Sequence, residues 1–170
     1  MNPLRDRRPK IRKMTLAHLR AVVELEKQLF SDPWSRRSFQ FEILANQYSL
    51  PLVLLLDKKL IGYAIVWIIF GEFHIANFAI HPDYQQKGFG SHLLKEILKK
   101  AVGLDYAILE VRESNLKAIR LYEKFGFERI AVRLRYYSNG DDAIIMRKWF
   151  RPPEQVIPKT GSYSKQKSKI

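Results

Sequence analysis

Residues 109–127 of the chain read LEVRESNLKAIRLYEKFGF, and this stretch decides the architecture of the second half of the protein. It begins inside a short apolar run, Tyr106–Val111, which is typical of a buried strand. From Asn115 onward the apolar residues recur at helical spacing, and Gly126 stands where a helix would end. The residues on that helical face are Ala118, Leu121, Tyr122 and Phe125. The stretch therefore predicts a strand followed closely by an amphipathic helix.

A strand and a helix are also predicted immediately upstream. Phe73–Ile80 is an apolar run that His81-Pro82 ends, because proline cannot donate to a sheet ladder. After Gly88 the apolar residues again fall at helical steps, at Gly90, Leu93, Leu94, Ile97, Leu98 and Ala101. A helix that connects two strands of one sheet makes those strands parallel. Because ligands in such sheets lie at the carboxyl ends of the strands, we expect a site near residues 80–90 and 110–115.

The remaining elements read as antiparallel neighbours. Turn residues at Asp57–Lys59 and at Ser138–Gly140 predict two hairpins, and Asn139-Gly140 is the stronger turn of the two. The other expected strands are 11–14, 52–56, 60–69, 128–137 and 142–149, and the expected helices include 16–30 and 36–44. The fold class is therefore α/β (α+β): one mixed, mostly antiparallel seven-stranded sheet with a parallel central pair, flanked by about four helices.

The chain has 170 residues and a net charge of +13, and much of this charge lies at its two ends. Residues 1–13 hold six basic residues and one acidic residue, and residues 151–170 hold five and one. We expect a basic N-terminal extension over 1–10, one folded domain over 11–150 and a flexible basic tail over 151–170. The charged ends either contact an anionic surface such as a ribosome or RNA, or are simply solvated.

The composition excludes several classes of protein. The chain has no cysteine, which removes disulfides, thiolate metal sites and a cysteine nucleophile. The apolar region from Leu50 to Phe70 is interrupted by Asp57, Lys58 and Lys59, so neither half is long enough to cross a membrane. The basic opening residues lack the apolar run of a secretory signal. We expect a soluble, cytoplasmic protein with no membrane contact.

The segment Gln85–Gly90, QQKGFG, lies between a predicted strand and a predicted helix. Glycines allow close backbone approach, and the free N–H groups at a helix start favour an anion such as a pyrophosphate. The spacing matches neither the dinucleotide-binding fingerprint nor a P-loop. Taken alone, the segment is equally consistent with a phosphate site and with a structural turn.

Three residues of the 109–127 stretch are candidates for chemistry. Glu110 ends the apolar strand, where a dry cleft would raise its pKa and make it a useful base, or where it would be exposed and paired with Arg112 or another basic residue. Tyr122 is on the apolar helix face, which suits either core packing or a hydroxyl aimed at a leaving group. Asn115 could simply cap the helix, as could Ser114.

Two motifs together resemble the GNAT acetyltransferase family. They are Gln-x-x-Gly-x-Gly over Gln85–Gly90 and Asn-x-x-Ala-Ile-x-Leu-Tyr-x-x-x-Gly-Phe over Asn115–Phe127. More narrowly, Leu109–Arg112, Arg135-x-Tyr137 and Asp142–Met146 resemble the RimI subfamily, as does Pro33-Trp34-Ser35. RimI enzymes acetylate the N-terminal alanine of a small-subunit ribosomal protein. The similarity spans about residues 11–149.

The resemblance implies a GNAT fold, acetyl-CoA as cosubstrate and a protein N-terminus as partner. It implies that the backbone of Phe78, Ala79 and Ile80 pairs with the pantetheine arm. It implies that the run Gln86, Lys87, Gly88, Phe89, Gly90 and Ser91 holds the pyrophosphate and that Asn115 contacts the cofactor beyond it. Two departures stand out: the family usually has Arg at Gln86, which removes a phosphate partner, and Glu at Asp141.

The implied mechanism is direct attack by the amine within a ternary complex. Glu110 would be the general base, a strand N–H near Ile80 would stabilise the oxyanion, and Tyr122 would be the general acid. The absence of cysteine favours this route over a covalent enzyme intermediate. No metal is predicted, because His18, His74, His81 and His92 lack metal-ligand spacing; we expect them at surface and turn positions. Tyr136-Tyr137 and Trp34 either line a peptide groove or pack elsewhere.

Two other functions stay open at this point. One is a GNAT acetyltransferase of lysine, a polyamine or an aminoglycoside, which Arg36, Arg37 and Arg135 near the site make less favourable. The other is a non-catalytic GNAT-fold protein that binds a ribosome or RNA through its basic ends. The presence of both Glu110 and Tyr122 favours catalysis over that second alternative.

Overall fold

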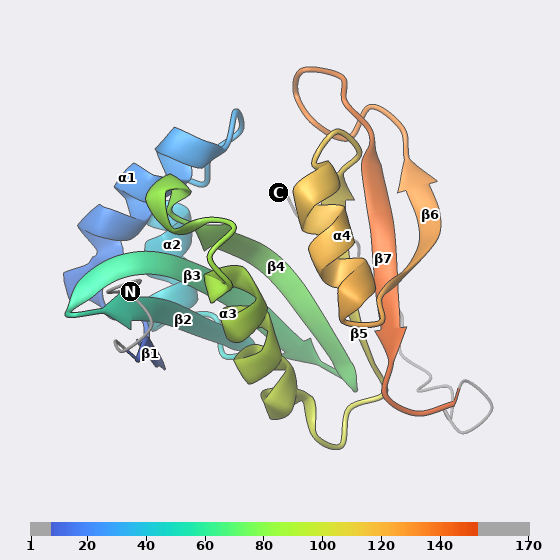
Figure 1. The fold of residues 1–170 in the computed structure, drawn as a ribbon, viewed down its shortest axis with the longest axis horizontal. Coiled ribbons are helices and arrows are strands. Elements are labelled where there is room, and N and C mark those ends of the chain that lie inside the picture. Colours follow the sequence, from blue (N-terminus) through green and yellow to red (C-terminus); the bar gives the residue numbers. More distant parts are fainter. Residues whose placement is uncertain (1–7, 153–170) are drawn as a thin grey trace.

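Seven strands lie side by side in the part of the chain that the computed structural model describes, residues 8–152 (Figure 1). Their order is β1-β2-β3-β4-β5-β7-β6. Only β4 and β5 run parallel, and every other neighbouring pair is antiparallel. The strands are β1 Lys10–Lys13, β2 Ser49–Leu56, β3 Lys59–Ile69, β4 Glu72–Ile80, β5 Tyr106–Arg112, β6 Glu128–Arg133 and β7 Ala143–Trp149. The predicted mixed sheet with a parallel central pair is confirmed.

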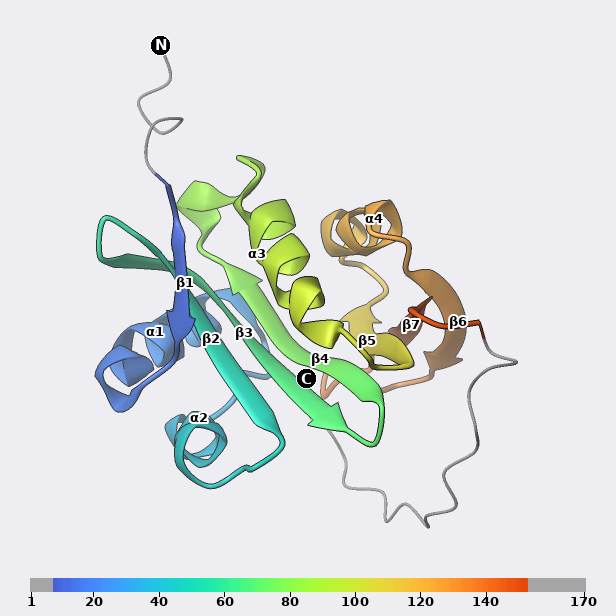
Figure 2. The same ribbon diagram turned by 90° about the horizontal axis from the view of Figure 1, so that it is seen from below.

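Helices cover the sheet on both faces (Figure 2). Helices α1 (Leu19–Leu29) and α2 (Arg36–Leu44) pack on one face, and α3 (Phe89–Leu98) and α4 (Leu116–Lys124) pack on the other. Two hydrophobic cores result, one on each face of the sheet. The helical spacing in the sequence explains α3, whose buried residues are Phe89, Leu93, Leu94 and Ile97.

Some boundaries differ from the prediction. Helix 16–30 is a 3₁₀ turn over Leu16–His18 followed by α1. The strand predicted at 52–56 begins three residues earlier, at Ser49. Residues 1–7, most of the predicted N-terminal extension, and 153–170, most of the predicted flexible tail, lie outside the described residues.

The last hairpin has a longer loop than the sequence predicts. β6 ends at Arg133 rather than at Tyr137, because Arg135 adopts a positive φ of 51° and its N–H donates to the Asp142 side chain at 2.7 Å. The Asn139-Gly140 turn is present, with the Gly140 N–H bonded to the Tyr137 carbonyl at 2.9 Å, but it lies inside this loop. This longer loop, over residues 134–142, brings Tyr137 and Asn139 to the cleft described below.

The parallel pair β4–β5 separates partway along its length. The strands pair only from Glu72 with Tyr106 to Ile75 with Leu109, and β4 then bulges at Ala76 relative to β3. Beyond this point β4 remains paired with β3, and β5 remains paired with β7. The divergence opens a space between the carboxyl ends of the two parallel strands, where the sequence places the site.

Gly62 of β3 lies against the diverging half of β4. A methyl group at this position would lie 2.7 Å from the carbonyl oxygen of Ala79 and 2.7 Å from Cδ1 of Ile80. Because the first of these atoms is backbone, Gly62→Ala should force the two strands apart and destabilise the fold by about 1–3 kcal/mol. A lowered midpoint of thermal unfolding would show this. Gly90→Ala is the matched control: its nearest contact, Leu121 Cδ2 at 3.5 Å, is an ordinary one, so an equal loss in both variants would contradict the explanation.

Candidate active site

A cleft of about 750 Å³ occupies the space where β4 and β5 diverge. Its walls come from the end of β4, the end of β5, the start of α3 and the inner side of α4. One end is bordered by the α1–α2 loop at Leu29–Asp32 and by Tyr137 and Asn139 of the β6–β7 loop. Nearly all of the predicted site residues line this cleft: Phe78, Ala79, Ile80, Gln86, Gly88, Gly90, Ser91, Glu110, Asn115 and Tyr122.

The turn before α3 is built to present backbone N–H groups. Gln86 and Gly88 both have positive φ, 58° and 87°, which curls the chain between β4 and the helix. Gln85 holds the turn to β4 by donating from Nε2 to the Ile80 carbonyl at 2.9 Å. Lys87 instead turns back to the Asp83 carbonyl, and Phe89 is buried in the core, so neither of these two lines the cleft. This geometry, with the amino end of α3 behind it, suits an anion.

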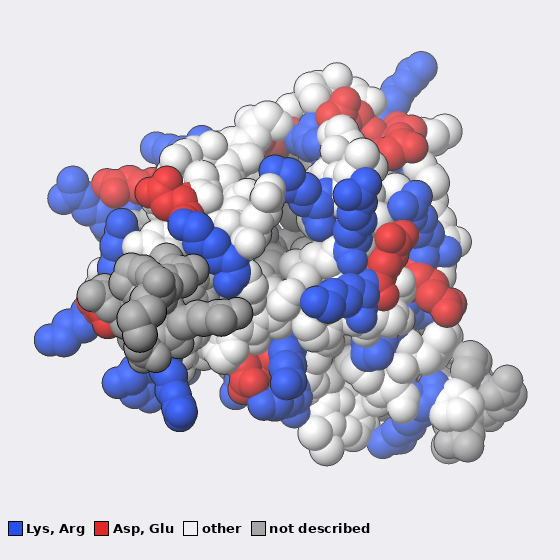
Figure 3. Space-filling view, viewed as in Figure 1, with Lys and Arg blue, Asp and Glu red and all other residues white. Residues whose placement is uncertain are grey.

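On the cleft side, the end of β4 is a strand edge with which no other strand of the described residues pairs, although the Gln85 side chain bonds to its Ile80 carbonyl. Phe78, Ala79 and Ile80 pair with β3 through Ala64, Tyr63 and Gly62, and no strand of residues 8–152 pairs with them on the other side. An extended, amide-containing molecule could therefore add to the sheet here, as a further strand would. Alongside, α4 presents the exposed basic residues Lys117, Arg120 and Lys124, and Figure 3 shows Lys and Arg side chains over this region.

Glu110 is held at the floor of the cleft by two partners. The residue is 8% exposed; Oε2 lies 2.8 Å from Nε2 of His74, and Oε1 lies 3.1 Å from a guanidinium nitrogen of Arg133. Burial on its own raises the pKa of Glu110, but the His74 hydrogen bond and the attraction of His74 and Arg133 outweigh it. The pKa of Glu110 therefore lies below its ordinary value. The predicted raised pKa is wrong, and so is the predicted exposure of the alternative; the pairing with a basic residue that the alternative included is present, with Arg133 rather than Arg112.

His74 is a site residue that the sequence analysis placed wrongly at the surface or in a turn. It lies within β4, and its side chain is largely buried, edge-on against Trp67 with ring centroids 5.3 Å apart. Its second nitrogen, Nδ1, lies 3.8 Å from Glu72. The parallel pairing was the available clue, because His74 and Glu110 are on the same face of neighbouring strands. His74 positions the Glu110 carboxylate.

Tyr122 enters the cleft from α4. Its ring is buried and packs edge-on against Phe78 at 6.2 Å and Phe127 at 5.8 Å between centroids. Burial raises the pKa of Tyr122 well above its ordinary value, and the nearby Tyr137 adds to the shift. The hydroxyl therefore stays protonated at neutral pH and is available as a donor.

Asn115 caps α4, accepting from the Ala118 N–H at 3.2 Å, and also lines the cleft.

Comparison with known proteins settles the family. The family model of the acetyltransferase (GNAT) family matches residues 19–127, more than half of the chain. The chain belongs to the GNAT acetyltransferase family.

Several relatives of this GNAT chain carry more specific names. It is 36% identical over 135 residues to the ribosomal protein bS18-alanine N-acetyltransferase of Escherichia coli (strain K12), covering 75% of this chain and 88% of that protein. It is 36% identical over 142 residues to the N-alpha-acetyltransferase RimI of Mycobacterium tuberculosis, covering 79% of this chain and 89% of that protein. The crystal structure of the Escherichia coli S18-alanine N-acetyltransferase matches with a TM-score of 0.78 at 31% identity, covering 88% of this chain and 99% of that one.

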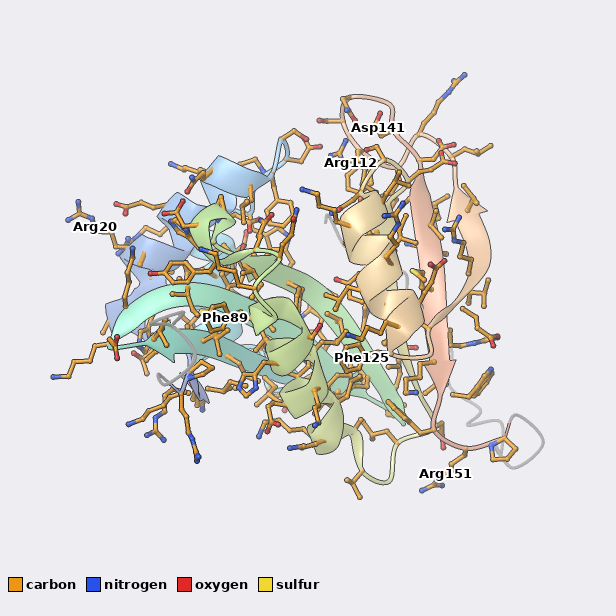
Figure 4. The ribbon with its side chains drawn as sticks, viewed as in Figure 1. Arg20, Phe89, Arg112, Phe125, Asp141 and Arg151 are labelled. Carbon is orange, nitrogen blue, oxygen red and sulfur yellow. The ribbon has the colours of Figure 1, made fainter. Side chains whose placement is uncertain are left out.

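In this GNAT enzyme Arg112 joins the two loops that border one end of the cleft. Its guanidinium donates to Asp141 at 2.5 Å and to Ser31 of the α1–α2 loop at 2.8 Å, and it lies 3.9 Å from the centre of the Tyr137 ring. Figure 4 shows Arg112 and Asp141 together at the top of the molecule. Asp141, one of the departures from the family pattern, therefore supplies a carboxylate to Arg112. Ser138 also donates to Asp32, so the loops are bonded at two points.

The three aromatic residues suggested for a peptide groove have different environments. Tyr137 lines the cleft, and burial raises the pKa of Tyr137 to about 12. Tyr136 stacks edge-on with Tyr137 and is not among the cleft residues. The groove role is wrong for Trp34, which is buried in the α1–α2 core between Phe39 and Trp67.

Residues 8–152 contain no group of three or more His, Cys, Asp or Glu side chains placed to hold a metal ion. Over the same residues, no helix is both long and apolar enough to span a membrane.

Proposed function

We propose that this enzyme transfers the acetyl group of acetyl-CoA to the α-amine at a protein N-terminus, and that the target is the N-terminal alanine of a small-subunit ribosomal protein. The observation that carries the proposal is the buried Glu110 carboxylate in a cleft that is also lined by an edge of β4 and by the glycine turn before α3. The names of the relatives, which are bS18-alanine N-acetyltransferases, support the substrate class.

The residues of the cleft fit the pantetheine arm and the pyrophosphate of acetyl-CoA. The pantetheine arm carries amides, which match the cleft edge of Phe78–Ile80, where no strand of residues 8–152 pairs with β4. The pyrophosphate matches the N–H groups of the turn from Gln86 to Gly88 and the amino end of α3. The exposed lysines and arginine of α4 add positive charge beside the cleft, where Gln86 supplies none.

The chemistry assigned to this chain's own residues follows from their charge states. Acetyl-CoA supplies the acetyl group as a thioester. A peptide α-amine has a pKa of about 8, so it arrives mostly as an ammonium ion at pH 7. The ammonium first loses one proton to solvent, and the neutral amine attacks the thioester. The ionised Glu110 then accepts, directly or through a water molecule, the second proton that the nitrogen loses as the amide forms, while His74 holds the carboxylate in place.

The remaining groups act on the thioester. A backbone N–H near Ile80 stabilises the negative charge that develops on the carbonyl oxygen. Tyr122, protonated at neutral pH, donates to the sulfur as the thiolate leaves. The chain contains no cysteine that could carry an acetyl group, so the amine attacks the thioester directly in a ternary complex.

Mass spectrometry of a peptide mixture tests the proposal. Full-length protein and acetyl-CoA are incubated with alanine-first peptides, peptides with other first residues, N-terminally blocked peptides with an internal lysine, and spermidine. We expect acetylation at the α-amine of the alanine-first peptides and no reaction of the blocked peptides or of spermidine. Acetylation of lysine or spermidine alone would overturn the proposed substrate class while leaving the acetyltransferase family intact.

A further inference from the structure

Asn77 of β4 is a buried polar residue that the mechanism above does not use. It is 3% exposed and follows the bulge at Ala76, at the point where β4 turns away from β5. Its amide nitrogen donates to both carboxylate oxygens of Glu26 in α1, at 3.2 and 3.1 Å. Asn77 also lines the cleft, as Glu110 does on the opposite strand.

Glu26 fixes which way the Asn77 amide points. Glu26 is 1% exposed, and its other partners are the Trp34 backbone N–H at 2.8 Å and the Tyr63 hydroxyl, both of which donate to it. A carboxylate that accepts every bond faces the amide nitrogen of Asn77 rather than its oxygen. Because the amide group is planar, Oδ1 of Asn77 then points away from α1.

Oδ1 of Asn77 is a buried acceptor with no hydrogen-bond partner within residues 8–152. Buried acceptors in folded proteins are nearly always paired, since an unmade bond there is unfavourable. An acceptor on the wall of a binding cleft can obtain its partner from a ligand. The ligand group required is an N–H or O–H donor that reaches the junction of β4 and β5, close to Glu110.

We propose that Oδ1 of Asn77 accepts a hydrogen bond from the α-amine of the substrate, and that Glu26 is the positioning residue that aims it. This inference rests on the proposed function. The neutral α-amine carries two N–H groups and a lone pair: the lone pair attacks the thioester, one N–H gives its proton to Glu110 as the amide forms, and the other N–H is bound by Asn77. Two acceptors on different strands thereby orient the nitrogen toward the thioester carbonyl. Asn77 recognises the N–H groups of the amine. A substrate with no N–H at that position should therefore bind no more tightly because of Asn77.

Calorimetry on the full chain loaded with CoA tests this assignment. Two peptides are compared: one begins with alanine, and the other is its des-amino analogue, in which a propionyl group replaces the alanyl group. Wild type should prefer the amine peptide. Asn77→Ala should reduce that preference roughly tenfold, because one hydrogen bond to a charged donor contributes about that factor in affinity. The affinities for the des-amino peptide and for acetyl-CoA should change less than twofold.

Tyr63→Phe is the matched control, because it also removes a donor from Glu26 but leaves the cleft acceptor in place. It should keep the amine preference within twofold of wild type even if the midpoint of thermal unfolding falls. Three results for Asn77→Ala would each overturn the inference: an equal loss of affinity for both peptides, an unchanged preference for the amine peptide, or a loss of affinity for acetyl-CoA. The third result would place the pantetheine arm at Oδ1. If wild type acetylates no α-amine in the mass-spectrometry panel, the proposed function fails first and this inference falls with it.

Discussion

Glu110→Gln lowers kcat for the alanine-first peptide roughly 100-fold or more, the range found for removal of a general base. The substitution keeps the size of the side chain and removes the charge that accepts the amine proton as the amide forms. Acetyl-CoA binding should stay within twofold, because the cofactor is expected on β4 and on the turn before α3, away from this carboxylate. Steady-state kinetics, together with calorimetric titration of acetyl-CoA, measure both quantities.

Glu113→Gln provides a matched control for that experiment. Glu113 is exposed, three residues further along the chain, and the same change of charge there should alter kcat less than twofold. A drop in kcat of less than tenfold in Glu110→Gln, or an equal drop in both variants, contradicts the assignment of Glu110 as base.

The dependence of kcat/KM on pH distinguishes ionisation of Glu110 from ionisation of the substrate amine. Because the pKa of Glu110 lies below its ordinary value, Glu110 is already ionised in the mildly acidic range and produces no rise in kcat/KM there. The rise should instead follow the peptide amine and level off near its pKa of about 8. Glu110→Gln should lower the plateau without moving the rise. A rise between pH 5 and 7 (roughly the range of a carboxyl with a raised pKa) would mean that Glu110 titrates there, against the pairing seen with His74 and Arg133.

The sequence could predict those parts of the fold that local patterns control. The spacing of Leu93, Leu94 and Ile97 produces α3, and the Asn115 cap and Gly126 bound α4. The helix between two apolar runs makes β4 and β5 parallel, and this alone places Glu110 and the glycine turn at the same edge of the sheet. Local periodicity and one topological rule were therefore sufficient to locate the site.

What the sequence could not predict depends on register between distant segments. His74 contacts Glu110 across 36 residues, and this contact reverses the expected direction of the Glu110 pKa shift. Asn77 meets Glu26 across 51 residues because β4 bulges at Ala76, and no local pattern marks that bulge. Trp34 matched a family segment, yet its ring is buried by Phe39 and Trp67. A one-residue shift in strand pairing would move His74 and Asn77 to the other face of the sheet.

Tyr122→Phe should lower kcat roughly 100-fold, because the departing thiolate loses its proton donor. The ring should keep its packing against Phe78 and Phe127, so the fold and the affinity for acetyl-CoA should change little. We expect kcat to fall while KM for acetyl-CoA stays almost unchanged, as measured by steady-state kinetics at saturating peptide. Burial raises the pKa of Tyr122 far enough that its hydroxyl stays protonated throughout the working range, so the Phe variant should have the same alkaline profile as wild type.

The competing donor for the thiolate is Tyr137, which lines the same cleft but enters from the β6–β7 loop. Its ring is held against Arg112 at the substrate end, on the loop that bonds to the α1–α2 loop, so its hydroxyl is expected to affect the peptide rather than the sulfur. Tyr137→Phe should therefore change KM for the peptide more than kcat. If Tyr137→Phe instead lowers kcat more than Tyr122→Phe does, the general acid is Tyr137. In that case Tyr122 would serve only to pack α4 against β4.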